Sequence, residues 1–120
     1  MNNPSWAELQ KALTALKIAL SSEKTDLNRD ATIQRFEFCV ELSWKTAKKV
    51  MGSSSSAPKA VIREMASQGL IADPDLWFEF LDARNDSSHT YKEEIAERVY
   101  SVAQKFFSHG ESLLEKLKVS

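Results

Sequence analysis

Glycine and proline are scarce in this chain of 120 residues, which holds three of each. An all-β fold needs a turn about every 8–12 residues, so the shortage of turn-forming residues argues against one. No apolar run approaches the roughly 20 residues of a membrane span. The first residues, "MNNPSWAELQ", lack the basic start and apolar stretch of a secretory signal. These absences favour a helical protein located in the cytoplasm.

The chain also has few cysteines and little net charge. Cys39 is the one cysteine, so no disulfide can form within the chain, and no neighbouring cysteine or histidine could share a metal with it. We therefore predict no metal and no cofactor. The formal net charge is −1, which provides no broad attraction to nucleic acid. An RNA or a nucleotide would have to bind at a local basic site.

The overall composition is that of an ordinary globular protein, with 42% hydrophobic and 28% charged residues. The length is that of one domain, spanning residues 1–120. Apolar residues recur at steps of three and four, which is the period of an amphipathic helix. The sequence therefore predicts an all-α fold, an antiparallel up-and-down bundle of about five helices.

Capping boxes predict the starts of the first and the fifth helix. In each, a hydroxyl residue is followed three positions later by a glutamate: Ser5 by Glu8, and Thr90 by Glu93. Gly110 is expected to loosen the last turns of the fifth helix, because glycine weakens a helix interior.

Glycine and proline mark the ends of the other helices. The second helix is expected to run from about Asn28 to Met51 and to stop at Gly52. Apolar residues occupy more than one of its sides, which predicts a central helix with several neighbours. The remaining end signals are Pro58 and Gly69 for the third helix, and Asp73 with Pro74 for the fourth.

The polar stretch "RNDSSHTY", from Arg84 to Tyr91, separates the fourth and fifth helices. On one continuous helix, Arg84 and His89 would diverge by about 140° and could not meet one ligand. The capping box at Thr90 predicts a break between them. Arg84 would then end one helix, Tyr91 would lie in the first turn of the next, and Arg84 and His89 could reach the same cavity.

This combination of residues fits phosphate chemistry. A guanidinium recognises phosphate through a fixed fork of donors and stabilises charge that develops during displacement. An imidazole, with an unperturbed pKa of about 6.5, can give or take a proton at neutral pH. An RNA 2′-hydroxyl that is activated by such a base can attack its own phosphodiester without a metal.

A purely structural interpretation is also open. Arg84 would interact favourably with the dipole at a helix C-terminus, and His89 could cap free carbonyls there. Asp82 and Asp86 could pair with Arg84 and occupy it. From spacing alone this interpretation is the stronger one, because an Arg and a His at this separation are common by chance.

A family resemblance favours the chemical interpretation. The segment "WFEFLDARNDSSHTY" resembles the signature of HEPN domains, in the branch of nucleotidyltransferase substrate-binding proteins, which combines an R-x4-H motif with a tyrosine two residues later. The segments "IQRFEFCVELSWKTAKKVM" and "APKAVIREMASQGLI" resemble the second and third helices of that branch. The resemblance covers about residues 30–99.

The resemblance implies a helical homodimer that brings two R-x4-H motifs into a shared cleft. It implies a metal-independent ribonuclease, acting on RNA such as tRNA, that is the toxin partner of a minimal nucleotidyltransferase antitoxin. Arg84 and His89 would be the catalytic pair, with Asn85 as a polar neighbour and Glu41 supporting the site. Tyr91 would be the hydroxyl that the partner modifies with AMP.

Two other functions remain open. The protein could bind or present a substrate to a nucleotidyltransferase without cleaving RNA, or it could be a bundle used only for assembly.

Lys45, Lys48 and Lys49 cluster at the end of the second helix, where the helix dipole favours cations. Contact of these lysines with an RNA backbone is the less favoured alternative. The aromatic residues expected in the core or a dimer interface are Phe36, Phe38, Trp44, Trp77 and Phe80, while His109 is expected on an exposed helix face.

Overall fold

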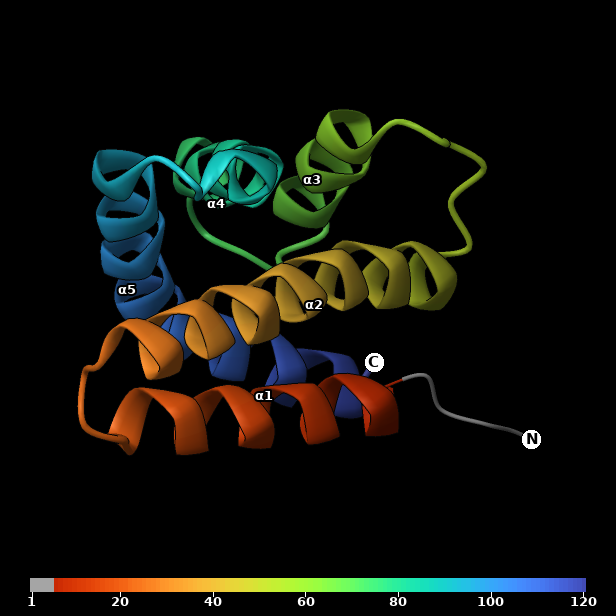
Figure 1. Cartoon of the computed structure of the whole chain (residues 1–120). Coiled ribbons are helices and arrows are strands. Elements are labelled where there is room, and N and C mark those ends of the chain that lie inside the picture. Colours follow the sequence, from red (N-terminus) through yellow and green to blue (C-terminus); the bar gives the residue numbers. More distant parts are fainter. Residues whose placement is uncertain (1–5) are drawn as a thin grey trace.

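The computed structural model describes residues 6–120, and five α-helices and one 3-10 turn make up its regular structure (Figure 1). No strand occurs within these residues, so the predicted all-α bundle is confirmed. The elements are α1 (Trp6–Ser21), α2 (Asp26–Met51), α3 (Pro58–Ser67), α4 (Pro74–Asp86), η1 (Ser87–His89) and α5 (Glu93–Lys118).

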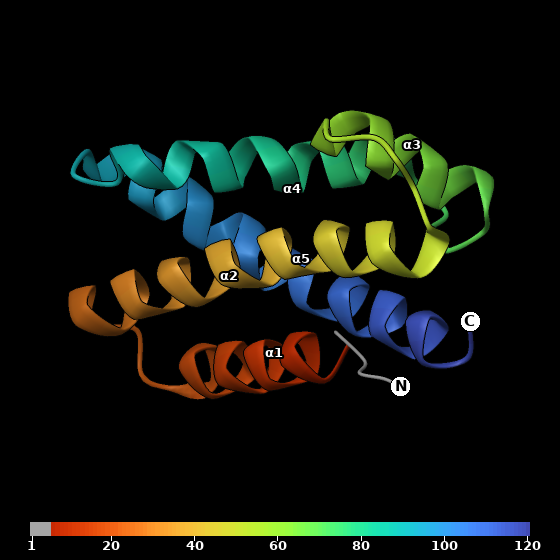
Figure 2. The same cartoon turned by 90° about the vertical axis from the view of Figure 1, so that its right-hand side faces the viewer.

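Helix α2 is the centre of the bundle, because all four of the other α-helices pack against it. Both views place α1 on one side of α2 and the pair α3 and α4 on the other, while α5 crosses behind α2 (Figures 1 and 2). The prediction of a central helix with several neighbours is confirmed. This arrangement brings the C-terminal end of α4 over the middle of α2, where the candidate site lies.

An aromatic cluster occupies the middle of the core. The ring of Phe106 meets those of Phe36, Trp77 and Phe80 edge to face, with centroids 5.4, 5.7 and 5.1 Å apart. Edge-to-face contacts add to the stabilisation from burial because they match the ring quadrupoles. Trp44 is buried as expected, but Phe38 is 45% exposed, so that residue does not belong to the core of the single chain.

The helix ends that depend on glycine and proline agree with the sequence. Gly52 caps α2 with φ of 67°, a left-handed conformation that glycine adopts without strain. Asp73 caps α4 by accepting a hydrogen bond from the backbone N–H of Leu76. The start of α2 was expected about two residues too late: Thr25 is its N-cap and accepts from the N–H of Asn28. The predicted cap at Ser5 lies outside the described residues.

Two expectations for α5 are wrong. Gly110 does not loosen the helix, which continues without interruption to Lys118. A Cβ at position 110 would lie 2.9 Å from Leu13 Cδ2 and 2.9 Å from Phe106 Cζ. The glycine therefore permits the close approach of α1 and α5. His109 is only half-exposed, because its ring packs against Phe80 with 5.7 Å between centroids.

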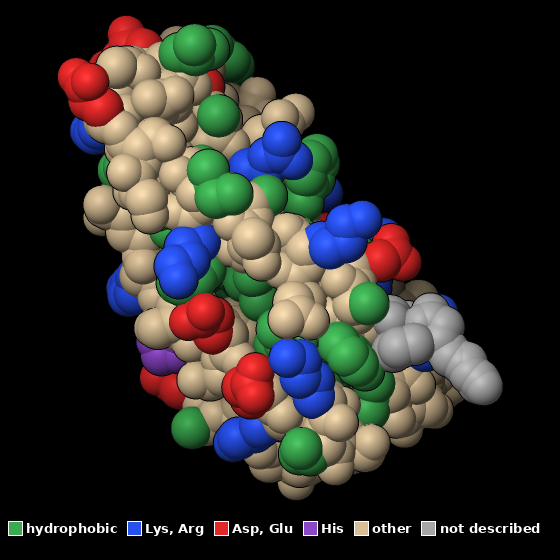
Figure 3. All heavy atoms as spheres, turned by 90° about the horizontal axis from the view of Figure 1, so that it is seen from below, with side chains coloured by type: hydrophobic (Ala, Val, Ile, Leu, Met, Phe, Trp, Pro, Cys, Tyr) green, Lys and Arg blue, Asp and Glu red, His purple; other side chains and the backbone are tan. Residues whose placement is uncertain are grey.

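The outer face beside α1 carries cationic and anionic side chains that are interspersed rather than grouped by sign, with hydrophobic side chains between them (Figure 3). This mixture agrees with a formal net charge of −1. No helix among residues 6–120 is both long and apolar enough to span a membrane.

Candidate functional site

The stretch from Arg84 to Tyr91 comprises the last residues of α4 and the tight polar turn that leads to α5. The hydroxyl of Ser87 donates to the carbonyl of Arg84 at 2.6 Å, and that of Ser88 donates to Asn85 at 3.3 Å. The predicted break between the helices is therefore present, as the 3-10 turn η1, which packs against α2, α4 and α5. The two serines close the turn and satisfy carbonyls at the end of α4.

The capping box predicted at Thr90 and Glu93 is wrong. The hydroxyl of Thr90 donates to the carbonyl of Ser87 at 3.2 Å and so closes the preceding turn. Lys92 is the N-cap of α5, and no side chain caps this end. Tyr91 consequently lies in the turn before α5, not in its first helical turn.

Two carboxylates of α2 hold the side chain of Arg84. Arg84 Nε donates to Glu41 Oε1 at 3.0 Å, and Arg84 Nη1 lies 3.8 Å from Glu37 Oε2. The three side chains are 29–33% exposed, so the guanidinium remains open to solvent and to an anion. The structural interpretation had Asp82 or Asp86 as the partner of Arg84, but Asp86 pairs with Arg98 instead.

Glu41 is shared between two cations. Its second oxygen, Oε2, lies 3.2 Å from Lys45 Nζ, one helical turn further along α2. Partial burial acts to raise the pKa of Glu41, but the hydrogen bond with Lys45 and the charges of Arg84 and Lys45 outweigh it and lower that pKa. Glu41 is therefore ionised at neutral pH and can orient Arg84.

His89 and Tyr91 lie together on the outside of the turn. Their ring centroids are 6.1 Å apart with an interplanar angle of 73°, and the Tyr91 side chain is 78% exposed. Asn85 is exposed at the end of α4. No hydrogen bond or ion pair in the described part of the chain joins the side chains of Arg84 and His89. The structure thus groups the predicted residues into two pairs, Arg84 with Glu41 and His89 with Tyr91.

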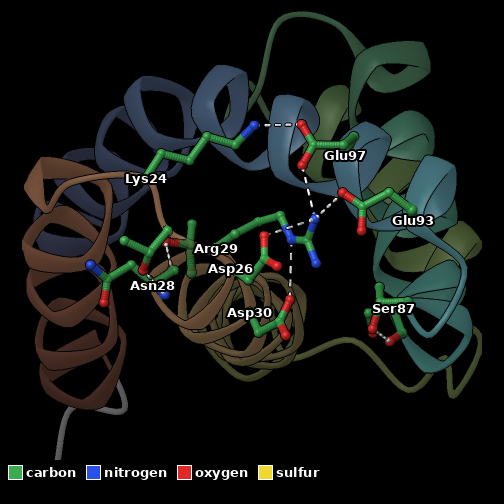
Figure 4. Close-up of polar contacts among 11 residues, drawn as sticks. Lys24, Asp26, Asn28, Arg29, Asp30, Ser87, Glu93 and Glu97 are labelled. Carbon is green, nitrogen blue, oxygen red and sulfur yellow. Dashed lines mark hydrogen bonds and ion pairs between the residues drawn. The ribbon is translucent and has the colours of Figure 1, made fainter.

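An ion cluster that the sequence did not predict fixes the start of α5. Arg29, in the first turns of α2, donates from Nη1 to Glu93 Oε2 at 2.6 Å and to Glu97 Oε2 at 3.0 Å (Figure 4). Its Nε also donates to Asp30 at 3.2 Å, and Lys24 pairs with Glu97. Because Glu93 follows the turn directly, this cluster fixes the C-terminal boundary of the segment that carries His89 and Tyr91.

The cluster around Arg29 is stabilised by charge. The hydrogen bond to Glu97 is the main cause that raises the pKa of Arg29 above its ordinary value, and burial opposes it. The hydrogen bonds from Lys24 and Arg29 lower the pKa of Glu97. No group of three or more histidine, cysteine, aspartate or glutamate side chains within residues 6–120 is arranged to hold a metal ion.

Comparison with known proteins identifies relatives over most of the chain. The sequence profile of the family described as "Nucleotidyltransferase substrate binding protein like" matches residues 5–119. A Haemophilus influenzae protein named "Probable ribonuclease HepT" is 36% identical over an alignment of 94 residues, and the match covers 72% of this chain. The match spans 64% of that relative, which is less than two thirds of its length.

Two solved structures have the same fold. One, from Thermus thermophilus, matches with a TM-score of 0.84 and 32% identity, over 91% of this chain and 98% of that chain. The other is a Haemophilus influenzae protein described as having the fold of a substrate-binding domain of a nucleotidyltransferase. It matches with a TM-score of 0.83 and 28% identity, over 94% of this chain and 98% of that chain. The profile, the relative and the two structures confirm the resemblance noted in the sequence: the chain belongs to the nucleotidyltransferase substrate-binding protein family of HEPN-like helical domains.

Proposed function

We propose that this protein is a metal-independent ribonuclease and the toxin of a two-protein module, with a minimal nucleotidyltransferase as its antitoxin. One observation carries the proposal: Arg84 is half-exposed and held by an ionised Glu41, at the end of the same turn that exposes His89. A relative that is named as a ribonuclease supports it. The activity is assigned to a single domain, residues 1–120.

In the proposed reaction, His89 removes the proton from a 2′-hydroxyl of the RNA, and the resulting oxygen attacks the adjacent phosphorus. The bond to the 5′-oxygen then breaks, this oxygen takes up the proton that His89 had removed, and a 2′,3′-cyclic phosphate is left on the other fragment. Arg84 binds the non-bridging oxygens, on which negative charge grows during the attack. His89 suits its role because imidazole exchanges protons near neutral pH.

Glu41 would be a positioning residue. It accepts from Arg84 Nε, which leaves the terminal nitrogens of the guanidinium for phosphate. A phosphate would have to displace the weaker contact of Nη1 with Glu37, at 3.8 Å. Asn85, exposed beside Arg84, is the next polar group that RNA would meet.

The proposal includes a homodimer. Within residues 6–120 of the single chain no hydrogen bond or ion pair joins the side chains of Arg84 and His89; His89 is exposed, and Arg84 is partly exposed beside α2. Two copies that pack with these turns facing each other would put four such side chains in one cleft. Phe38, which is 45% exposed on α2, would be covered by the second copy.

Tyr91 offers a site for control by the partner. Its side chain is 78% exposed and lies beside His89, so a nucleotidyltransferase could reach the hydroxyl and attach AMP to it. The attached nucleotide would place a bulky anion where the RNA phosphate has to bind. In this proposal the partner silences the toxin by modification.

A second candidate function is the presentation of a substrate to a nucleotidyltransferase without RNA cleavage. The family description and the solved relative that is described as a substrate-binding domain support it. The exposure of Tyr91 is compatible with it as well. It differs from the first function in needing no chemistry from His89.

The deciding experiment incubates the purified protein with total tRNA in the presence of a chelator, beside a folded His89→Ala variant. His109→Ala is a matched control, because it removes the other histidine of the chain, on α5 and outside the proposed site. Cleavage by the wild type and by His109→Ala, but not by His89→Ala, with 2′,3′-cyclic phosphate ends, is the expected result.

Intact RNA in every reaction would overturn the ribonuclease and favour the presenting partner. The next measurement would then be complex formation with the nucleotidyltransferase by wild type and Tyr91→Phe. If His89→Ala unfolds or loses its oligomeric state, the motif has the role of a structural support that holds two helices together.

A further inference from the structure

A cationic hollow lies at the C-terminal end of α2, away from the turn that carries His89. It has a volume of about 400 Å³ and is lined by Lys45, Lys48, Lys49, Gly52 and Ser53. Three of the lining residues are lysines, and no carboxylate is among the lining residues. A concave surface with several cations and no anion attracts a small anionic group.

Lys48 and Lys49 have no carboxylate partner within residues 6–120. In contrast, Lys45 pairs with Glu41, and Lys105 pairs with Glu79 at 3.0 Å. The charges of Lys48 and Lys49 are therefore not neutralised within the chain. Two such charges on adjacent residues repel each other, and a bound anion would relieve this repulsion.

The helix dipole alone would also favour lysines at this position. The end of α2 is, however, already capped by backbone groups. Gly52 N–H donates to the carbonyl of Lys49 at 3.2 Å, and Ser53 N–H donates to that of Lys48 at 3.0 Å. The lysine side chains are thus not needed to satisfy these carbonyls, and their ammonium groups remain available to a ligand.

The hollow shares a face of α2 with the residue that orients Arg84. Seven residues of an α-helix turn through nearly two full turns, so Lys48 lies within about 20° of Glu41 around the axis and about 10 Å further along it. Lys45 lies between them and contacts Glu41 at 3.2 Å. Arg84, Lys45 and Lys48 therefore form a line of cations along one side of α2.

We propose that Lys48 and Lys49 bind a backbone phosphate of the RNA, a short distance along the strand from the phosphate that Arg84 holds. The inference rests on the proposed ribonuclease function and adds a second contact to it. Such a contact carries no sequence information, but it fixes the direction in which the strand crosses the site. The strand would run along α2, from the polar turn toward Gly52.

The test measures binding of a fluorescein-labelled single-stranded oligoribonucleotide by anisotropy over a series of salt concentrations. All proteins carry His89→Ala, so that the RNA stays intact. The test variant adds Lys48→Ala and Lys49→Ala. The matched control adds Lys11→Ala and Lys17→Ala, which remove the same charge from exposed positions of α1. Alanine is a strong helix former, so both double variants should fold, and circular dichroism checks this.

Lys48→Ala/Lys49→Ala should weaken binding to RNAs of different sequence to the same extent. It should also reduce the slope of log K against log salt by about 0.7 for each phosphate that the variant no longer binds. Lys11→Ala/Lys17→Ala should leave the slope unchanged. If the test variant keeps the affinity and slope of its His89→Ala parent while the wild type cleaves RNA, this inference is wrong and the ribonuclease proposal stands. If the parent binds no RNA and the wild type cleaves none, the proposed function itself has failed, and the phosphate site fails with it.

Discussion

Arg29 and Arg84 each connect α2 to a later helix through glutamates, yet they differ in how completely they are enclosed. The side chain of Arg29 is 7% exposed and contacts four carboxylates, at Asp26, Asp30, Glu93 and Glu97. That of Arg84 is 29% exposed and contacts two, one of them at 3.8 Å.

The difference indicates two uses of the same group. An enclosed guanidinium whose nitrogens meet carboxylates has little left for a ligand, and it fixes the packing of α2 against α5. A guanidinium held on one side keeps donors free toward solvent, which is what recognition of phosphate requires. We expect substitutions at the two positions to separate stability from activity.

The largest expected effect is that of Arg84→Ala on RNA cleavage. Removal of a group that stabilises developing charge lowers a rate by about 10²–10³-fold, so the cleavage rate should fall by that factor. Arg84→Lys should retain more of the cleavage rate than Arg84→Ala, because lysine keeps the positive charge but lacks the forked donors of the guanidinium. Single-turnover cleavage of tRNA measures both. Unchanged rates in Arg84→Ala would remove Arg84 from the proposed mechanism.

Arg29→Ala should have the next largest effect, and it should act on stability. The variant loses charged hydrogen bonds to Glu93 and Glu97 and leaves a gap between α2 and α5, so the free energy of unfolding should fall by about 2–3 kcal/mol. Arg84→Ala should lower it by less than about 1 kcal/mol, since its pairs are half-exposed. Urea denaturation measures both values. Equal losses at the two positions would contradict the comparison.

Acid should weaken the Arg29 cluster. The hydrogen bonds from Lys24 and Arg29 lower the pKa of Glu97 below its ordinary 4.5 in the folded protein. The unfolded chain then binds the proton first, so this contribution to stability is complete above pH 4.5 and is lost as the pH falls through the folded-state pKa. Thermal unfolding between neutral and acid pH should show a smaller decrease for Glu97→Gln than for wild type. An identical decrease in the two proteins would show that protonation of Glu97 does not contribute to the loss of stability in acid.

The smallest effect is expected at Cys39, a buried thiol in the core of the bundle. Burial raises the pKa of this thiol to about 12, so little reactive thiolate forms near neutral pH. Alkylation of the native protein should therefore be slow, and Arg84→Ala should not change its rate. Arg29→Ala should accelerate it modestly by favouring local opening. Rapid labelling of the wild type would argue against this enclosed core.

Local signals predicted much of the fold. Gly52, Pro58 and Asp73 with Pro74 mark helix ends through the backbone conformation of one or two residues, so they can be recognised without tertiary contacts. Thr90 has the same kind of signal, yet its hydroxyl bonds to Ser87 and α5 begins at Glu93. Here Arg29, far away in the sequence, binds Glu93 and helps to set the start of the helix.

The candidate site could be predicted only as a set of residues. The spacing of Arg84, His89 and Tyr91 identified them, and the resemblance added Glu41, whose contact with Arg84 joins residues 43 positions apart. Arg29 was not predicted to form an ion cluster, although it precedes Ile33 by four positions and Phe36 by seven and so lies on the apolar side of α2. A charged residue in such a register indicates a buried ion pair, but only the structure gives its partners.

Gly110 shows how an aromatic core restricts the variation that this family member can tolerate. Alanine is normally preferred to glycine inside a helix, by about 1 kcal/mol. At this position its methyl group would press on the Phe106 ring, which three other aromatic rings already hold in place. Alanine, the most conservative replacement, is thus excluded at position 110 although helix propensity would favour it. We expect glycine to be retained at this position as long as Phe106 is retained.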